Sequence, residues 1–250
     1  DGAYPPARSM LDPRTPPAER AAFARAFESV RNLEARSPAR AIAGFRDLLA
    51  RQPGFAEAHY RLGMRLEAAG DGSGAKTHFL RARDLDGMPM RCPSPLQDAY
   101  KQAAARHSRL VLVDGPSVLA ARSPHGIVDD HLIHDGQHPT LLGYIALAQD
   151  LLDQLCARRA FGWPDGVPAP RIDTAECAAH FGIDAACWAH VCRRSAWYYR
   201  RTAYIRYDPI PALERAERYE HAAAAIESGQ DPNALALPGI GLHLPTGPGP

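Results

Sequence analysis

The sequence lacks long hydrophobic runs and has no excess of charge of either sign. Uninterrupted apolar runs such as Ala222–Ile226 stop at five residues, whereas a membrane-spanning helix needs roughly 18. Lysine and arginine together number 29 and aspartate and glutamate 28, so the formal net charge of the 250 residues is +1. We therefore expect no membrane span, and no overall electric field that would gather nucleic acid or anionic lipid.

Cysteine is too scarce to indicate a disulfide framework. The five cysteines are an odd number in a chain long enough to build a hydrophobic core. Cys177 with His180 and Cys187 with His190 have the i, i+3 spacing that zinc ligands can take on a helix. Because a free cysteine is usually a small buried hydrophobe, we interpret these side chains as packing residues and expect no metal or other cofactor.

The sequence contains a single segment with a convincing β-strand pattern. Residues 110–115 read Leu-Val-Leu-Val-Asp-Gly, which is typical of a strand buried on both faces of a parallel sheet. A lone strand would leave backbone amides and carbonyls unpaired, at a cost of about 1–3 kcal/mol for each buried group. We therefore expect the other strands to come from sequence upstream of Asp1, with this chain as the C-terminal portion of a longer protein.

Proline and glycine divide the remaining sequence into parts with different patterns. The first twenty residues contain five prolines and exclude a regular helix there. Helical spacing of apolar residues dominates the rest of the chain. We expect an irregular lead-in over 1–20, helical repeats over 21–90, part of an α/β domain over 91–157, a helical extension over 158–236, and a Pro/Gly-rich tail without a fixed fold over 237–250.

The segment 21–90 carries a partial internal repeat of about 34 residues, which places Phe45 on Phe79. The second copy resembles a tetratricopeptide repeat, with Leu62-Gly63 in its first helix and Phe79 between small residues in its second. This resemblance implies paired helices that offer a surface to a protein partner. Two units are fewer than the three or so needed for independent stability, so they should pack on another part of the chain.

The densest polar cluster follows the predicted strand and runs from Asp129 to Pro139. Thr140 is placed to cap the amphipathic helix that comes next, predicted over 141–155. Asp135 and His138 are the candidate catalytic residues of this cluster. At three residues' distance the carboxylate can accept the Nδ1 proton of the imidazole, which leaves Nε2 free to take a proton from a nucleophile.

The order Asp135-x-x-His138-Pro139, followed by Gly143-Tyr144, resembles the last signature block of the SGNH, or GDSL-type, serine hydrolases. The resemblance implies an α/β fold, in which residues 91–157 are the C-terminal part of a three-layer α/β/α, flavodoxin-like domain. The tetratricopeptide-like segment ahead of this block is similar to the helical repeats that a subgroup of bacterial hydrolase-like proteins carries as an insertion in the catalytic domain. The resemblance also implies a Ser-His-Asp triad that acts on ester bonds, with an acylated carbohydrate or lipid as the suggested substrate. In this triad Asp135 is the acid and His138 is the base.

The family's Gly-Asp-Ser block and its other oxyanion-hole donors are absent from this sequence. Ser73 stands in Asp71-Gly72-Ser73-Gly74, but between predicted repeat helices. Ser117 and Ser123 follow the predicted strand without a Gly-Asp context. We therefore expect this chain to supply only the acid and the base, and to be inactive by itself.

Other interpretations of the polar cluster and of the whole chain stay open. The cluster can be a solvated capping loop. His131, His134 and His138, with Asp129 or Asp130, can also hold zinc or iron. The chain as a whole can be a non-catalytic tetratricopeptide-repeat module that binds a protein partner, with the α/β part as its support.

Residues 193–207 interleave arginine with tryptophan and tyrosine, a pattern found in proteins that bind single-stranded nucleic acid. On a helix, Trp197 and Tyr204 fall on one stripe with an arginine stem, and such a stripe can pack inward while the charged groups reach water. We favour this packing interpretation and expect no nucleic-acid partner.

Overall fold

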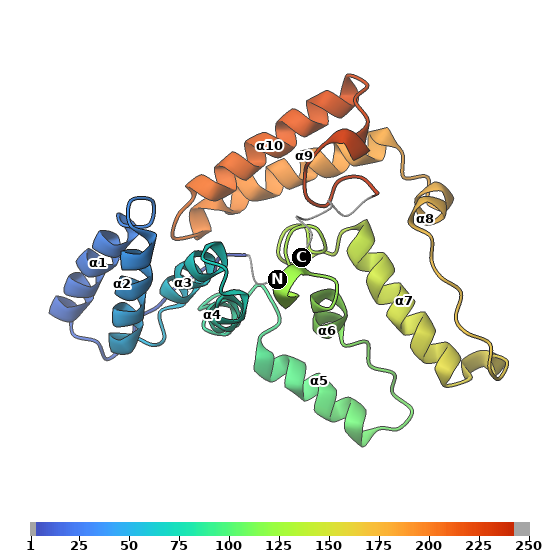
Figure 1. The fold of residues 1–250 in the computed structure, drawn as a ribbon, viewed down its shortest axis with the longest axis horizontal. Coiled ribbons are helices and arrows are strands. Elements are labelled where there is room, and N and C mark those ends of the chain that lie inside the picture. Colours follow the sequence, from blue (N-terminus) through green and yellow to red (C-terminus); the bar gives the residue numbers. More distant parts are fainter. Residues whose placement is uncertain (1–3, 243–250) are drawn as a thin grey trace. The chain divides into compact units, whose positions relative to one another are not determined.

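The computed structural model describes residues 4–242, and this part of the chain is built from helices with no β-sheet. One isolated antiparallel bridge, between Ile133 and Pro139, is the β pairing that it contains. The described residues form two compact units (Figure 1). The first unit comprises residues 4–95 and 204–208, and the second comprises residues 96–203 and 209–242.

The predicted three-layer α/β/α domain is therefore wrong for the described residues. The segment 110–114, predicted as a buried strand, is neither strand nor helix, and Leu110 is half exposed. The backbone carbonyls of Leu110 and Leu112 accept hydrogen bonds from the side chains of Arg158 and Gln154. An apolar β-branched run becomes a strand only when a neighbouring strand satisfies its backbone, and no described segment lies beside this one to do so.

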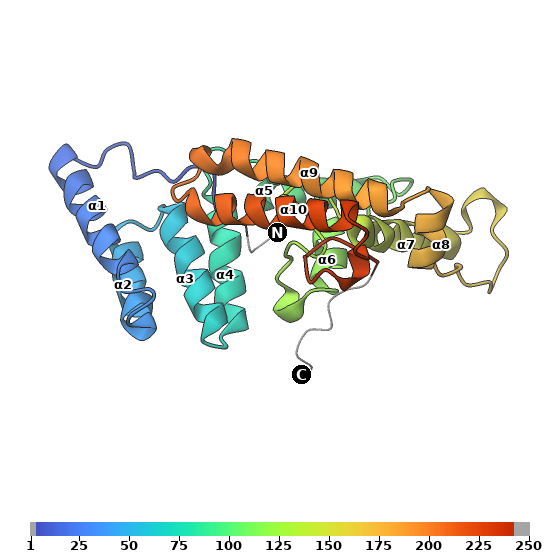
Figure 2. The same ribbon diagram turned by 90° about the horizontal axis from the view of Figure 1, so that it is seen from above.

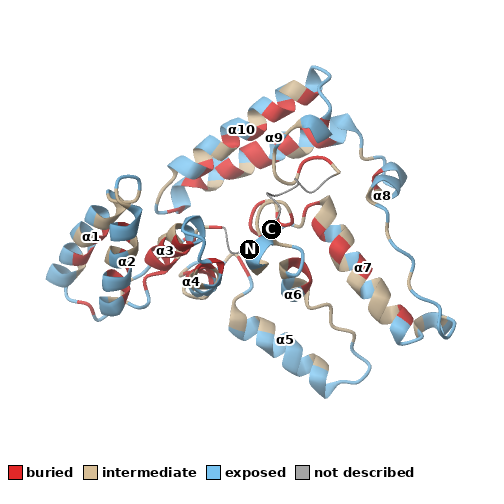
Figure 3. Cartoon of the chain, in the orientation of Figure 1, coloured by how far each residue is buried: buried red, intermediate tan, exposed pale blue. Residues whose placement is uncertain are grey.

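Helices α1 to α4 make up most of the first unit. In α1, α2 and α4 the buried residues recur mainly at spacings of three and four, which places them on one face, whereas the first four residues of α3 are all buried (Figure 3). Phe27 packs against Phe45 and Phe55, with ring centroids 6.0 and 5.2 Å apart. The bounds are α1 Pro17–Arg31, α2 Pro38–Arg51, α3 Ala56–Ala68 and α4 Gly72–Asp84.

Helices α3 and α4 approach closely at Gly63. A Cβ atom on Gly63 would lie 2.8 Å from a carbon of the Phe79 ring, so the ring occupies the space that the missing side chain leaves. Leu62, Ala75 and Ala82 beside it are fully buried. The small residues that the sequence places in this helix pair thus let Phe79 fill the space between the two helices.

Six helices belong wholly or largely to the second unit. Helices α9 and α10 lie side by side along their length in both views (Figures 1 and 2), and the rings of Tyr199 and Tyr219 stack between them at 5.8 Å. The helices are α5 Ser94–Arg106, α6 Gly115–Ala120, α7 Leu141–Ala157, α8 Thr174–His180, α9 Ala185–Thr202 and α10 Ile210–Glu227.

The inward packing predicted for Trp197 and Tyr204 is wrong. Trp197 is 58% exposed, and Tyr204 is more exposed still. The buried face of α9 instead carries Cys192, Ala196 and Tyr199, which face the small residues of α10. The alanine-rich face of α10 permits this close packing, and it leaves Trp197 on the other side of α9.

The helix predicted after Thr140 is confirmed as α7, and Thr140 caps it by accepting a hydrogen bond from the Gly143 amide at 3.1 Å. No helix of the described chain is long and apolar enough to cross a membrane, as the short apolar runs predict. Of the predicted tail, residues 237–242 pack on the second unit and bury Ile240, whereas residues 243–250 lie outside the described residues.

A pair of neutral histidines links α3 and α4. The Nδ1 atoms of His59 and His78 lie 2.9 Å apart, and His59 Nε2 lies 3.1 Å from the Pro53 carbonyl oxygen. Nε2 of His59 therefore carries a proton and its Nδ1 accepts one from His78. Burial lowers the pKa of His59 to about 4 and also lowers the pKa of His78.

Replacing His59 with glutamine should reduce the pH dependence of stability. The pKa of His59 is about 4 in the fold against 6.5 in the unfolded chain, so the unfolded state binds the proton more readily. The contribution of the neutral His59 ring to the free energy of unfolding is fully present above pH 6.5 and is lost as the pH falls through about 4. The urea midpoint of His59→Gln should therefore fall less than that of the wild type on acidification, because the amide still bonds Pro53 and does not titrate in this range.

His107→Gln, the same substitution at an exposed position, is the matched control. Equal loss of stability on acidification in the wild type and in His59→Gln would show that the pair does not titrate as described.

Candidate functional site

The candidate site lies in the loop that precedes α7, where the chain turns back on itself. The His134 amide donates to the His138 carbonyl at 2.8 Å, and the Thr140 amide donates to the Leu132 carbonyl at 3.0 Å. Gly136 takes a φ of +84° at the turn, a conformation that favours glycine. The loop is thereby closed into a short hairpin with residues 135–137 at its tip.

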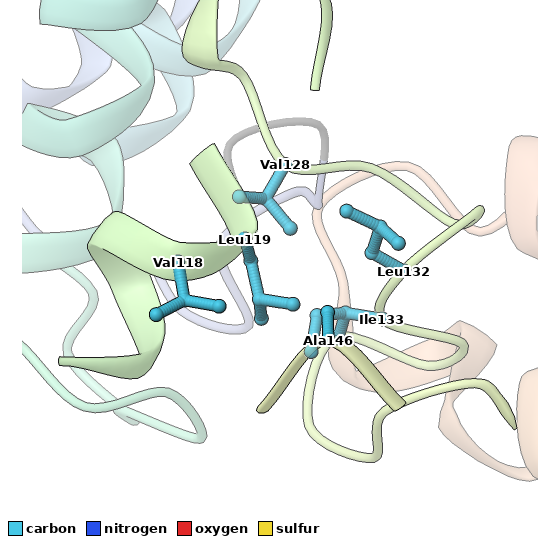
Figure 4. Close-up of a cluster of buried hydrophobic side chains, with 6 residues drawn as sticks. All are labelled: Val118, Leu119, Val128, Leu132, Ile133 and Ala146. Atoms are coloured by element: carbon cyan, nitrogen blue, oxygen red, sulfur yellow. The ribbon is translucent and has the colours of Figure 1, made fainter. Parts of the chain in front are cut away.

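A hydrophobic cluster packs against this hairpin (Figure 4). Leu132 and Ile133 of the loop contribute to it, together with residues of α6, of α7 and of the chain between α6 and the loop. The loop backbone is therefore anchored by buried side chains. The other buried members are Val118, Leu119, Val128 and Ala146.

The Asp135 carboxylate is held by hydrogen bonds to both of its oxygens. Oδ1 accepts from the backbone amides of Gln137, at 3.0 Å, and of His138, at 2.9 Å. Oδ2 lies 2.8 Å from Nδ1 of the His138 ring. The Asp135 side chain is only 11% exposed, so its orientation is fixed by the turn that it stabilises.

The His138 ring is accessible on the side away from Asp135. Its side chain is 68% exposed, and no described residue hydrogen-bonds Nε2. Because the carboxylate can only accept, Nδ1 carries the proton in the neutral ring and the lone pair lies on Nε2. The two candidate catalytic residues are thus placed together, with a basic nitrogen left available.

The start of α7 packs directly on the loop backbone. A Cβ atom on Gly143 would overlap the carbonyl oxygen of Leu132, so this position has no room for a side chain. The Thr140 hydroxyl donates to the His131 carbonyl at 2.7 Å and accepts from the Gly143 amide. The Gly143 that forms part of the SGNH-like pattern therefore has a steric role, which is to let α7 touch the hairpin.

The three histidines of the loop have different partners and do not converge on one point. Nδ1 of His131 lies 2.9 Å from Asp129, whose hydrogen bond raises the pKa of His131. Nε2 of His134 contacts the hydroxyl of Ser195, and burial lowers the pKa of His134 to about 4. Within residues 4–242, no group of three or more histidine, cysteine, aspartate or glutamate side chains is arranged to hold a metal ion. The Cys-x-x-His pairs of α8 and α9 therefore form no such group either.

Sequence reasoning missed two residues that fix the loop from α9 and α10. Arg215 forms an ion pair with Asp130 at 2.6 Å. The Tyr199 hydroxyl donates to the His134 carbonyl at 2.6 Å, and Arg215 donates to the Tyr199 oxygen at 3.3 Å. Neither residue belongs to a local sequence motif. The sequence signal that could have indicated Arg215 is its place beside the buried alanine and tyrosine residues of α10.

No serine hydroxyl within the described chain is hydrogen-bonded to His138. Ser117 donates to Asp114 at 2.8 Å and Ser123 to the Leu119 carbonyl at 2.9 Å, while Ser73 lies in the other unit, at the start of α4. Ser195 contacts a histidine, but it is 4% exposed and donates its proton to the Val191 carbonyl. Its neighbour His134 has a pKa lowered by burial, which makes it a poor base at neutral pH.

Comparisons with models of known protein families, with curated proteins and with solved structures find no match for this chain. The interpretation of the site therefore rests on the residues and contacts of the loop.

Gly143→Ala should destabilise the second unit. The added methyl group meets a backbone oxygen of the hairpin, which cannot rotate away, so α7 or the loop must shift at a cost of about 1–3 kcal/mol. This loss should exceed the gain of roughly 1 kcal/mol from the higher helix propensity of alanine. Urea denaturation measures the difference, and Gly54→Ala, where the space is open, is the control. A Gly143→Ala protein as stable as the wild type would refute the close packing.

Proposed function

We propose that the loop before α7 is the acid–base part of an SGNH-type hydrolase that acts on ester bonds. The proposal depends mainly on one observation, the 2.8 Å hydrogen bond between Asp135 and Nδ1 of an otherwise exposed His138 ring. A carboxylate on Nδ1 fixes the ring orientation and its tautomer, and it stabilises the imidazolium that forms when Nε2 takes a proton. The order Asp-x-x-His-Pro followed by Gly143-Tyr144 supports the choice of this family.

In this mechanism His138 moves one proton in two steps. Nε2 first accepts the proton of a serine hydroxyl as the serine oxygen attacks the ester carbonyl. The imidazolium then donates that proton to the leaving alcohol as the tetrahedral intermediate collapses. Asp135 takes no part in the proton transfer itself: it accepts the Nδ1 hydrogen bond and holds the imidazole ring in place.

The proposal requires a serine near Nε2 of His138, and the described residues provide none. We therefore propose that the nucleophile and the oxyanion-hole donors come from polypeptide outside residues 4–242, and that this chain alone does not turn over esters. The substrate class is an ester, with an acyl group on a carbohydrate or lipid as the suggested form. Because this chain supplies a general base but no nucleophile, we expect it to hydrolyse esters only when it is assembled with that polypeptide.

The test is ester hydrolysis by a longer polypeptide of the kind that the proposal requires, in which a Gly-Asp-Ser block is joined to this chain. With p-nitrophenyl acetate as substrate, His138→Ala should lower kcat by at least about 100-fold, which is the usual contribution of a general base. The exposed neighbour Gln137 provides the matched control, and Gln137→Ala should keep the wild-type rate. Turnover that survives His138→Ala would contradict the proposal, as would turnover by residues 1–250 alone.

A second function, recognition of a peptide by the helical repeats, is favoured by a separate observation. Residues 206–208 lie against α1, α3 and the segment before α1, and their side chains contact residues of all three. This function uses the first unit, so it can coexist with chemistry at the loop before α7.

A further inference from the structure

The connection between α9 and α10 makes its side-chain contacts with the first unit. Residues 204–208 group with residues 4–95, although the chain on either side of them belongs to the second unit. Three consecutive residues, Arg206, Tyr207 and Asp208, each contact residues of the first unit, and Arg31 contacts both Tyr207 and Asp208. Such a series of side-chain sites along a short segment is how proteins recognise a peptide.

The Asp208 carboxylate is bound by two arginines from different helices. One Oδ2 oxygen accepts from Arg31 of α1 at 2.8 Å and from Arg61 of α3 at 3.2 Å. Arg61 is itself oriented by Glu34 and Glu57, at 2.7 and 2.8 Å, and its side chain is largely buried. Residues other than Asp208 therefore fix the orientation of Arg61, one of its arginine partners.

Tyr207 fills the next position, against the aromatic residues of the first unit. Its ring meets those of Phe27 and Phe55 edge to face, at 5.1 and 6.4 Å between centroids. The hydroxyl donates to Glu28 at 2.7 Å, and the Arg31 guanidinium lies 5.5 Å from the ring centroid. An aromatic ring with a hydrogen-bonding end fits these contacts, whereas an aliphatic side chain would leave Glu28 without this donor.

Arg206 occupies a third position beside the segment before α1. Its guanidinium lies 4.1 Å from the centroid of the Tyr4 ring and donates to the Pro5 carbonyl at 2.8 Å. Arg206 is buried. A planar cation stacked on an aromatic ring is favoured at this position over a compact ammonium group.

We propose that the face formed by α1, α3 and the segment before α1 is a recognition site for a peptide with the order Arg-Tyr-Asp. Residues 206–208 are the ligand that the chain itself provides, and a partner protein that presents the same basic–aromatic–acidic order displaces them. This inference rests on the peptide-recognition function of the repeats and is independent of the hydrolase proposal. The intramolecular segment is part of the same chain and competes with any added peptide, so the free site is seen best when that segment is weakened.

The test measures binding of a fluorescent peptide to the full chain. The peptide has the sequence of residues 203–210, Ala-Tyr-Ile-Arg-Tyr-Asp-Pro-Ile. The variant Tyr207→Ser/Asp208→Asn, called the vacated variant, removes the ring and the carboxylate of the chain's own ligand, and fluorescence anisotropy should show binding at least tenfold tighter than to the wild type. A peptide with asparagine in place of aspartate should bind this variant at least tenfold more weakly.

Two further substitutions in the vacated variant locate the site. Adding Arg61→Gln should abolish binding, because it removes an arginine that binds the carboxylate. Adding Arg25→Gln should leave binding unchanged, because Arg25 is exposed on α1 and contacts none of residues 206–208. Circular dichroism checks that each variant keeps the wild-type helix content.

A vacated variant that is folded but binds no peptide would overturn the proposal, and equal binding of the aspartate and asparagine peptides would do the same. If the vacated variant does not fold, the wild type decides the question. Saturating unlabelled peptide should then raise hydrogen–deuterium exchange in residues 204–208, and unchanged exchange would overturn the proposal. None of these outcomes depends on ester hydrolysis.

Discussion

The hydrogen bonds of a single carboxylate, that of Asp135, define the candidate site. One oxygen fixes the backbone of the turn through two amides, and the other fixes the ring of His138. The same group therefore shapes the loop and orients the base, so the position of the imidazole is coupled to the fold of the turn. This coupling explains how an exposed histidine can be held in one orientation without being packed in the core.

The rest of the second unit holds the turn in place from two sides. Leu132 and Ile133 anchor it in the hydrophobic cluster, and the missing side chain of Gly143 lets α7 pack against its backbone. From α9 and α10, Tyr199 bonds the His134 carbonyl and Arg215 pairs with the loop. The loop is thus supported both by helices near it in the sequence and by helices far from it.

The pair Asp135 and His138 could be predicted because its geometry is local: three residues of separation and a glycine between them suffice for the hydrogen bond. The α7 cap was predictable for the same reason. The strand at 110–114 was not, because a strand exists only with a partner and the sequence pattern cannot show whether one is present. Arg215 was missed because its contact with the loop spans 85 residues, from position 130 to position 215, without a motif.

The direct test of the account is the protonation site of the neutral His138 ring, measured by long-range ¹H–¹⁵N NMR. The hydrogen bond to Asp135 predicts a proton on Nδ1 and an unprotonated Nε2. In Asp135→Ala this preference should disappear. A wild-type ring that carries its proton on Nε2 would contradict the account, because no basic nitrogen would then face a nucleophile.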